Sequence, residues 1–180
     1  MQVMGISGMP GSGKSLVSEI AIEKGGEIVS MGDIIREEAK KRNEDTKTTA
    51  KKLREEYGPN IVAELTIAKV KILIEENKSS LIIIEGIRSP FEINLFKINF
   101  NDFKVLSIFA NPTLRFERLK QRKRTDDSKN YDEFVKRDQM ELNFGIGSVI
   151  ALSDKIIVNE TDLESYVKKI NDYLNVIINP

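Results

Sequence analysis

The sequence predicts a single α/β domain, in which a five-stranded parallel sheet has helices on both faces. Two observations support this fold class. Short runs rich in Ile and Val alternate with longer amphipathic stretches, and no repeat or low-complexity linker divides the chain. The length of 180 residues is enough for one domain with a substantial core. We therefore expect residues 1–180 to form one three-layer unit.

The predicted strands are short hydrophobic runs, as is typical of strands that are buried on both faces. They are residues 3–7, 27–30, 81–85, 104–109 and 155–158. A helix is predicted over residues 15–24, because Gly25 and Gly26 follow it as a stop signal.

Other helices are predicted from their start signals. Pro59 stands where a first helical residue is expected, ahead of four apolar side chains at helical spacing: Ile61, Leu65, Ala68 and Ile72. The pairs Asn130 with Glu133 and Thr161 with Glu164 fit capping boxes. Two polar stretches, 36–57 and 122–131, interrupt the alternation, and we interpret each as a flap at the functional edge of the sheet.

The composition excludes several kinds of chemistry. There is no Cys and no His, which rules out disulfides, thiol nucleophiles, imidazole bases, and thiolate or imidazole metal sites. The 28 basic residues balance 28 acidic ones, which argues against non-specific binding to nucleic acid or to membrane surfaces. The longest apolar runs have four residues and no signal peptide is seen, so we expect a cytoplasmic protein without membrane contact.

A phosphate-binding loop follows the first predicted strand. The motif G-x-x-x-x-G-K-[ST] is matched by Gly8, Met9, Pro10, Gly11, Ser12, Gly13, Lys14 and Ser15. Its glycines let backbone N–H groups turn toward phosphate oxygens at the positive end of a helix. Lys14 would lie against the β- and γ-phosphates, and Ser15 would offer a hydroxyl to Mg²⁺. We predict a nucleoside triphosphate site, with Mg²⁺ as the cofactor.

A carboxylate and an arginine follow the third predicted strand. Glu85 ends the strand and Arg88 comes three residues later, and in α/β sheets ligands bind beyond the strand ends. Glu85 would hold Mg²⁺ through water, and Arg88 would bind an acceptor phosphate with its guanidinium fork. The alternative is a solvated strand end.

Several segments resemble adenylate kinases. Val-Ser-Met-Gly-Asp-Ile-Ile-Arg at residues 29–36 resembles the segment that opens their nucleoside-monophosphate site. Glu-Gly-Ile-Arg at 85–88 is similar to their Asp-Gly-Phe-Pro-Arg turn, with Glu for Asp and without the proline. Arg118, Arg122 and Arg124 match the arginines at the start of the lid, and Lys136 with Arg137 replaces the usual closing arginine pair.

The C-terminal half resembles dephospho-coenzyme A kinases, in residues 122–127 and 151–160. The chain is thus identified as a member of an archaeal, adenylate-kinase-related group of P-loop kinases that lies between the two families. This resemblance implies a nucleoside-monophosphate-kinase-like fold. It also implies an acceptor-binding insertion at about 32–77 and a short lid at about 122–132.

The resemblance also assigns roles to individual residues. Arg118 would bind ATP, while Asp33, Arg36 and Arg88 would bind the acceptor. The catalytic set would be Lys14, Asp33, Arg88, Arg122, Arg124 and Arg137. In the basic segment 115–124, we expect Arg115 and Lys120 to lie on a solvated helix face; a patch for tRNA or membranes is a further interpretation of the segment. Asp33 is either a helix cap or the base for a hydroxyl acceptor.

Three functions follow. The leading one is ATP- and Mg²⁺-dependent transfer of a phosphoryl group to a nucleoside monophosphate such as AMP. The second is transfer to a ribose hydroxyl, as in dephospho-coenzyme A kinases, with Asp33 as the base. The third is an ATP-binding switch or regulatory ATPase that acts on a protein or RNA partner. The sequence leaves the acceptor and the oligomeric state open.

Overall fold

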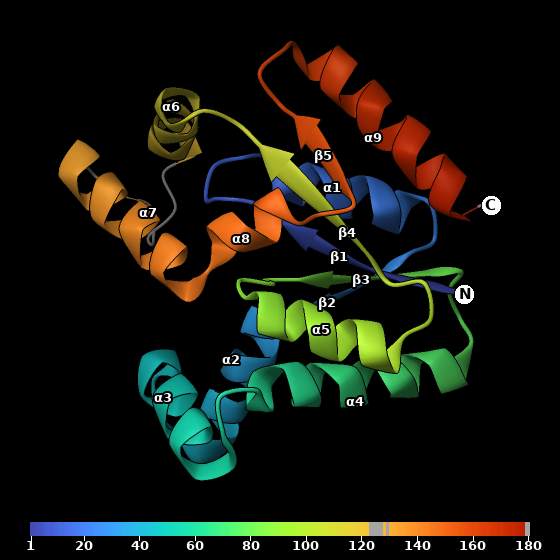
Figure 1. Ribbon diagram of the computed structural model, residues 1–180, viewed down its shortest axis with the longest axis vertical. Helices are drawn as coiled ribbons and strands as arrows, with labels where there is room; N and C mark the ends of the chain where they lie inside the picture. The colour runs from blue at the N-terminus through green and yellow to red at the C-terminus, as the bar shows by residue number, and fades with distance from the viewer. Residues whose placement is uncertain (123–127, 129, 179–180) are drawn as a thin grey trace.

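A five-stranded parallel sheet forms the centre of the molecule (Figure 1). The computed structural model describes residues 1–122, 128 and 130–178. The strands are β1 (Gln2–Ser7), β2 (Glu27–Ser30), β3 (Leu81–Glu85), β4 (Lys104–Phe109) and β5 (Lys155–Val158). Their order is β2-β3-β1-β4-β5, and every neighbouring pair is parallel. The predicted fold class is confirmed, and only β1 differs from its predicted bounds, by one residue.

Helices cover both faces of this sheet. They are α1 (Lys14–Glu23), α2 (Met31–Arg42), α3 (Thr46–Tyr57), α4 (Ile61–Glu76), α5 (Pro90–Asn99), α6 (Pro112–Arg122), α7 (Tyr131–Phe144), α8 (Ile146–Ala151) and α9 (Leu163–Ile178). None of the helices in the described part of the chain has the length and hydrophobicity that a membrane crossing requires.

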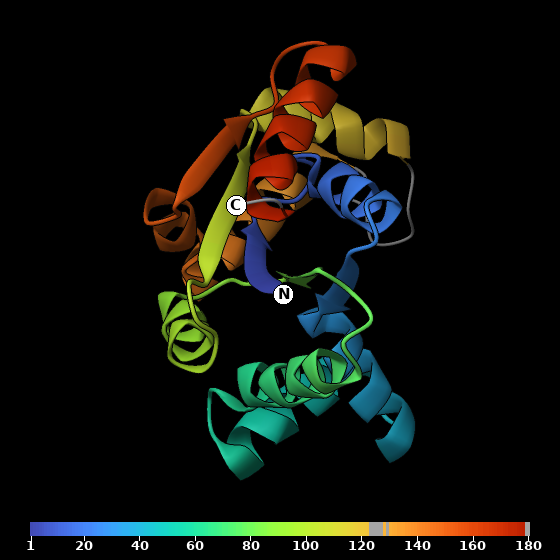
Figure 2. The ribbon, with the colours of Figure 1, turned by 90° about the vertical axis from the view of Figure 1, so that its right-hand side faces the viewer.

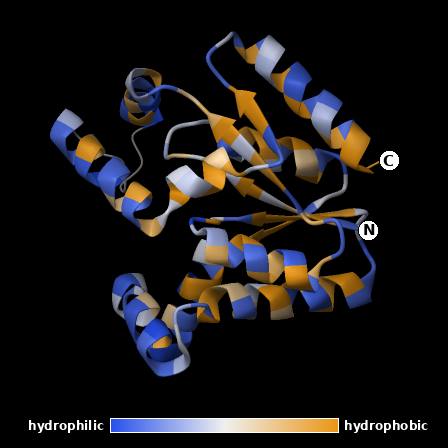
Figure 3. Cartoon of the chain, in the orientation of Figure 1, coloured by the Kyte–Doolittle hydropathy of each residue, from blue (hydrophilic) through white to orange (hydrophobic). Residues whose placement is uncertain are grey.

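The side chains of β3 show how the two layers of core arise. Leu81 and Ile83 pack in the cluster that includes α1 and α9, whereas Ile82 and Ile84 pack in the cluster with α4 and α5. All four side chains are fully buried. Because successive strand residues point to opposite faces, a run of apolar residues can fill both cores. Figure 3 shows the strands as hydrophobic and α3 as largely hydrophilic.

The polar stretch 36–57 consists of the second half of α2 and all of α3, joined by residues 43–45. Asn43 ends α2 in the left-handed conformation, with a φ of 55°. The Asp45 carboxylate then accepts hydrogen bonds of 2.9 Å from the N–H groups of Lys47 and Thr48, so that α3 can begin. The second predicted flap, 122–131, falls largely outside the described residues.

Two predicted helix starts were wrong by one or two positions. Asn60 precedes α4, so Pro59 lies outside the helix. At the start of α9, it is the Asp162 carboxylate, rather than Thr161, that accepts the hydrogen bond from the Ser165 N–H, at 2.8 Å. Asn130 is confirmed as the cap of α7. Neighbouring polar residues compete for the same N–H groups, and local sequence alone does not rank them.

Two groups of helices lie on either side of the edge at which β1 and β3 end. Helices α2, α3 and α4 contact one another on one side, and α6 and α7 lie on the other (Figures 1 and 2). The functional side chains described below come mainly from the strand ends at this edge and from α6 and α7.

Candidate functional site

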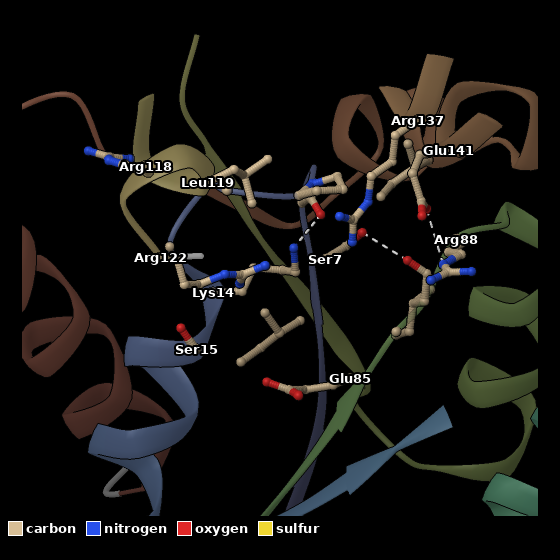
Figure 4. Close-up of a pocket in the computed structure, with 18 residues that line it drawn as sticks. Ser7, Lys14, Ser15, Glu85, Arg88, Arg118, Leu119, Arg122, Arg137 and Glu141 are labelled. Carbon is tan, nitrogen blue, oxygen red and sulfur yellow. Dashed lines mark hydrogen bonds and ion pairs between the residues drawn. The ribbon is translucent and has the colours of Figure 1, made fainter. Parts of the chain in front are cut away.

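A cavity of about 380 Å³ opens at this edge, and it brings most of the predicted site residues together (Figure 4). Its lining includes Gly8, Pro10, Gly11, Gly13, Lys14, Ser15, Glu85, Arg88, Arg118, Arg122 and Arg137. Met9, Ser12, Asp33 and Arg36 are not in the lining. Arg124 lies outside the described residues. Three separate parts of the chain thus meet at one site: the loop after β1, the turn after β3, and helices α6 and α7.

The phosphate-binding loop joins β1 directly to α1, and its last glycine has a structural reason. Gly13 precedes α1 with a φ of 101°, in the left-handed region. A Cβ atom there would also collide with the side-chain amide of Asn159. Gly13 is therefore required both by the turn and by the close approach of the C-terminal part of the chain.

Three side chains from the second half of the chain hold backbone carbonyls of this loop. Arg115 Nη1 donates to the Pro10 carbonyl at 3.1 Å, and Asn159 Nδ2 donates to the Ser12 carbonyl at 2.8 Å. The Tyr166 hydroxyl donates to the Gly13 carbonyl at 3.0 Å. The Gly13 carbonyl also accepts a hydrogen bond from the Leu16 N–H at 3.3 Å, so Tyr166 supplies it with a second donor. We refer to Arg115, Asn159 and Tyr166 as the loop-holding residues.

We expect Tyr166→Phe to lower the free energy of unfolding by about 1 kcal/mol, because the Gly13 carbonyl would lose the shorter of its two hydrogen bonds and keep only the one from the Leu16 N–H at 3.3 Å. Chemical denaturation measures this change. Tyr173→Phe is the matched control, since the Tyr173 hydroxyl is buried and has no hydrogen-bond partner among the described residues. Its removal should leave the stability within about 0.5 kcal/mol or raise it. Equal losses in both variants would contradict the role of the Tyr166 hydrogen bond.

Lys14 lines the cavity, and its side chain bonds to the backbone of the phosphate-binding loop. Its Nζ donates to the carbonyls of Gly8, at 2.5 Å, and Met9, at 3.1 Å. Loss of solvation lowers the pKa of Lys14 to about 8, although the negative charges of Glu85 and Glu141 act in the opposite direction. The ammonium group is thus held in a place where an added anion would stabilise it.

Ser15 and Glu85 provide the donor types that Mg²⁺ requires. Ser15 is exposed in the first turn of α1, and Glu85 ends β3; both line the cavity (Figure 4). The Ser18 hydroxyl bonds to the Glu85 carboxylate and orients it. No group of three or more His, Cys, Asp or Glu side chains suited to a metal exists among the described residues. One hydroxyl and one carboxylate fit Mg²⁺, which obtains most of its ligands from phosphates and water.

Arg88 reaches the cavity from a turn whose backbone is held by hydrogen bonds to Glu92. The Glu92 carboxylate accepts hydrogen bonds from the backbone N–H groups of Arg88, at 2.8 Å, and Ser89, at 3.1 Å. The side chain of Arg88 forms an ion pair with Glu141 of α7, with 3.1 Å between Nε and Oε2. Arg88 also lies over the ring of Phe144, 5.7 Å from its centroid. The turn after β3 is thereby connected to α7.

The prediction for Arg115 was wrong, because its side chain is buried rather than solvated. Only 4% of it is exposed, and Nη1 lies 2.8 Å from an Asp138 oxygen in a two-fold ion pair. Its guanidinium carbon lies 5.0 Å from the centroid of the Phe134 ring. Arg115 therefore connects α6, the phosphate-binding loop and α7. Lys120 is exposed, as expected.

Asp33 and Arg36 lie in the first turns of α2 and bond to each other. Arg36 Nε donates to Asp33 Oδ1 at 2.8 Å, and more than half of each side chain is exposed. The cap of α2 is Ser30, whose hydroxyl accepts the hydrogen bond from the Asp33 N–H at 3.3 Å. Asp33 is thus the third residue of the helix, which corrects the interpretation of this residue as the cap.

A second cavity, of about 310 Å³, lies beside the loop and shares Gly13, Ser15 and Arg118 with the first. Its remaining lining residues are Leu16, Asn159, Thr161, Leu163 and Tyr166. Arg118 Nη2 donates to the Asn159 carbonyl at 3.0 Å, which holds the guanidinium between the two cavities. Its buried Nη1 has no partner in the part of the chain that the structure describes.

The sequence analysis missed several residues of this region: Arg115, Asp138, Glu141, Asn159 and Tyr166. For Glu141, the spacing of residues along α7 was a usable indication. Glu141 follows Arg137 by four residues, so the two side chains share one face of the helix. Asn159 and Tyr166 left no local signal, because their partners are about 150 residues away.

Known proteins are similar to this chain over most of its length. An AAA domain family model matches residues 7–135. A UPF0200 protein of Methanothermobacter thermautotrophicus is 52% identical over 160 residues, which cover 89% of this chain and 82% of that protein. A UPF0200 protein of Pyrococcus furiosus is 46% identical over 179 residues, covering 96% and 95% of the two chains.

Solved structures share the fold at low sequence identity. The protein TT1252 from Thermus thermophilus has a TM-score of 0.70 at 15% identity, covering 97% of both chains. Shikimate kinase from Acinetobacter baumannii, solved in complex with shikimate, has a TM-score of 0.59 at 14% identity, covering 99% of this chain and 93% of that one. These similarities show a P-loop kinase-like fold.

Proposed function

We propose that this chain, which belongs to the UPF0200 family and contains an AAA domain, is an ATP- and Mg²⁺-dependent phosphotransferase that acts on a small acceptor. The observation that carries the proposal is the composition of the larger cavity. Lys14 and Ser15 of the phosphate-binding loop share it with four arginines from three other elements, namely Arg88, Arg118, Arg122 and Arg137. Such a concentration of cations suits a transferring phosphoryl group, whose charge spreads over three oxygens.

ATP occupies both cavities in this proposal. Its phosphates lie in the phosphate-binding loop against Lys14, and its adenine base lies in the second cavity next to Arg118. The support is that the two cavities meet at Gly13, Ser15 and Arg118, so that one molecule can extend through both. The flat guanidinium of Arg118 suits stacking against a base.

The protein residues then act on the phosphates by position and charge. Lys14 holds the β- and γ-phosphate oxygens, and Arg122 and Arg137 stabilise the charge of the transferring group. Ser15 and Glu85 would hold Mg²⁺, which neutralises phosphate charge when it is bound. The walls of the cavity limit the access of water to this group.

The acceptor occupies the part of the cavity next to Arg88. The sequence favours a nucleoside monophosphate such as AMP, bound by Arg36 and Arg88, and the alternative is a hydroxyl acceptor with Asp33 as the base. Arg88 is in the cavity lining, whereas Arg36 and Asp33 bond to each other outside it. The acceptor-binding insertion at 32–77 and the lid at 122–132 remain part of the proposal.

We expect the pure protein with ATP and Mg²⁺ to transfer phosphate to at least one of AMP, CMP, UMP, dephospho-coenzyme A and shikimate. Coupled detection of ADP, together with product analysis by ³¹P NMR, measures this transfer. Omission of Mg²⁺ should abolish it, and a control without acceptor gives the rate of simple hydrolysis. ATP hydrolysis that only a protein or RNA stimulates, with none of the five compounds consumed, would favour the regulatory ATPase instead.

A further inference from the structure

We propose that Glu141 is a catalytic residue, which accepts the proton from a hydroxyl group on the acceptor, and that the acceptor therefore reacts through a hydroxyl rather than a phosphate. The inference rests on the proposed phosphotransferase function and narrows its substrate class. It begins from the position of one carboxylate in a cavity that is otherwise lined by cations.

Two acidic side chains are in the described lining of the larger cavity, Glu85 and Glu141. Glu85 ends β3 beside Ser18 and Ser15, on the side where Mg²⁺ is expected. Glu141 is on α7, one helical turn after Arg137, and Figure 4 shows both side chains pointing into the cavity near Arg88. Only 13% of the Glu141 side chain is exposed. The carboxylate is thus largely buried, and it lines the cavity that a bound molecule would occupy.

The charge of Glu141 discriminates between the two kinds of acceptor. An acceptor phosphate on Arg88 would share that guanidinium with Glu141 and bring two anionic groups close together in a partly buried site. A hydroxyl acceptor adds no second anion there. The ion pair with Arg88 holds the Glu141 carboxylate in place, and a carboxylate oxygen can still accept a hydrogen bond from the hydroxyl.

Glu141 and Lys14 line the same cavity, so this carboxylate lies near the expected site of transfer. Lys14 is the residue that the motif places against the β- and γ-phosphates. Arg88 and Arg137 are the other charged groups next to Glu141 in Figure 4. Glu141 therefore faces the region between the γ-phosphate and the acceptor.

The reaction step balances without any further reagent. The acceptor oxygen forms a bond to the γ-phosphorus, while the bond from that phosphorus to the oxygen bridging it to the β-phosphorus breaks. The bridging oxygen keeps the electron pair and leaves as part of ADP. The hydroxyl proton passes to the Glu141 carboxylate and from there to solvent.

Asp33, the base expected from the sequence, is placed differently. Its side chain is 54% exposed, pairs with Arg36 and does not line the cavity. A general base must lie in the same cavity as the phosphate-binding loop. Glu141 has this position in the structure, and Asp33 does not.

The product identifies the acceptor group, so the first measurement is ³¹P NMR of the product formed from ATP, Mg²⁺ and each of the five compounds above. We expect a new phosphate monoester on the acceptor, which shows that a hydroxyl was phosphorylated. A new phosphoanhydride, such as CDP formed from CMP, would overturn this inference and leave the phosphotransferase proposal intact. Transfer to none of the compounds would overturn the phosphotransferase proposal itself.

The second measurement is the turnover of Glu141→Gln, which keeps the size of the side chain and removes the charge. We expect kcat to fall by about 10²–10⁴-fold while KM for ATP stays within a few-fold. Glu117→Gln is the matched control, because Glu117 is exposed on α6 and does not line the cavity. It should retain the wild-type rate.

A purely structural role of Glu141 predicts a different result. If Glu141 only held Arg88, then Glu141→Gln would mainly raise KM for the acceptor. The double variant Arg88→Ala/Glu141→Gln would then turn over no more slowly than Arg88→Ala alone. That pattern would overturn the inference. A large loss in Asp33→Asn, with Glu141→Gln unaffected, would also overturn it and assign the base to Asp33.

Discussion

Lys14→Met is expected to reduce ATP-dependent phosphoryl transfer by about 10³-fold, because it removes the cation that faces the phosphates inside a partly desolvated cavity. Steady-state kinetics with ATP and Mg²⁺ measures the loss, and circular dichroism checks that the fold is retained. Lys168→Met is the matched control, since Lys168 is exposed on α9 and lines neither cavity. Wild-type turnover in Lys14→Met would contradict the assignment of the phosphate site.

The same residue predicts how ATP affinity depends on pH. Burial lowers the pKa of Lys14 to about 8 in the free protein, and bound phosphates would raise it again. Above pH 8, ATP binding should therefore take up a proton, and the affinity should fall as the pH rises further. Calorimetry in buffers of different ionisation enthalpy measures this uptake, and Lys14→Met should abolish it.

The largest effect on stability is expected at Arg115. Arg115→Ala should lower the free energy of unfolding by about 3–5 kcal/mol, because it leaves Asp138 partly buried without its cation. It also removes the donors to the Pro10 and Ala110 carbonyls, which lie 3.1 Å from Nη1 and Nε respectively. Urea denaturation, monitored by circular dichroism, measures the change.

A surface ion pair provides the control for Arg115. Arg42 pairs with Glu56 at 3.0 Å between α2 and α3, and the two side chains are 25% and 44% exposed. Arg42→Ala should therefore cost only about 0–1 kcal/mol. A loss in Arg115→Ala as small as that of Arg42→Ala would show that the buried pair contributes little to the connection between α6, the phosphate-binding loop and α7.

The sequence predicted those parts of the site that depend on neighbouring residues. The motif at residues 8–15 requires a strand before it and a helix after it, and both are present as β1 and α1. Glu85 and Arg88 were predicted from their place after a buried strand, and both line the cavity. The two residues share this position because the carboxyl ends of parallel strands meet at one edge of the sheet.

Residues with more than one plausible environment could not be assigned in this way. Arg115 and Lys120 have similar local surroundings, yet one is buried against Asp138 and the other is exposed. Asp33 has the spacing of a site residue, but its exposed pair with Arg36 lies outside the cavity. In each case the partner that decides the role comes from the three-dimensional packing.

The sequence by itself determined the fold class, the five strands and the phosphate-binding loop, because these depend on hydrophobic periodicity and on a short motif. Only the tertiary structure decided which distant side chains hold that loop, and which carboxylate enters the cavity. Asn159, Tyr166 and Glu141 acquire their partners only when the C-terminal third of the chain packs against the first fifteen residues and the turn after β3. Such contacts depend on the arrangement of the whole sheet, which local residue patterns do not specify.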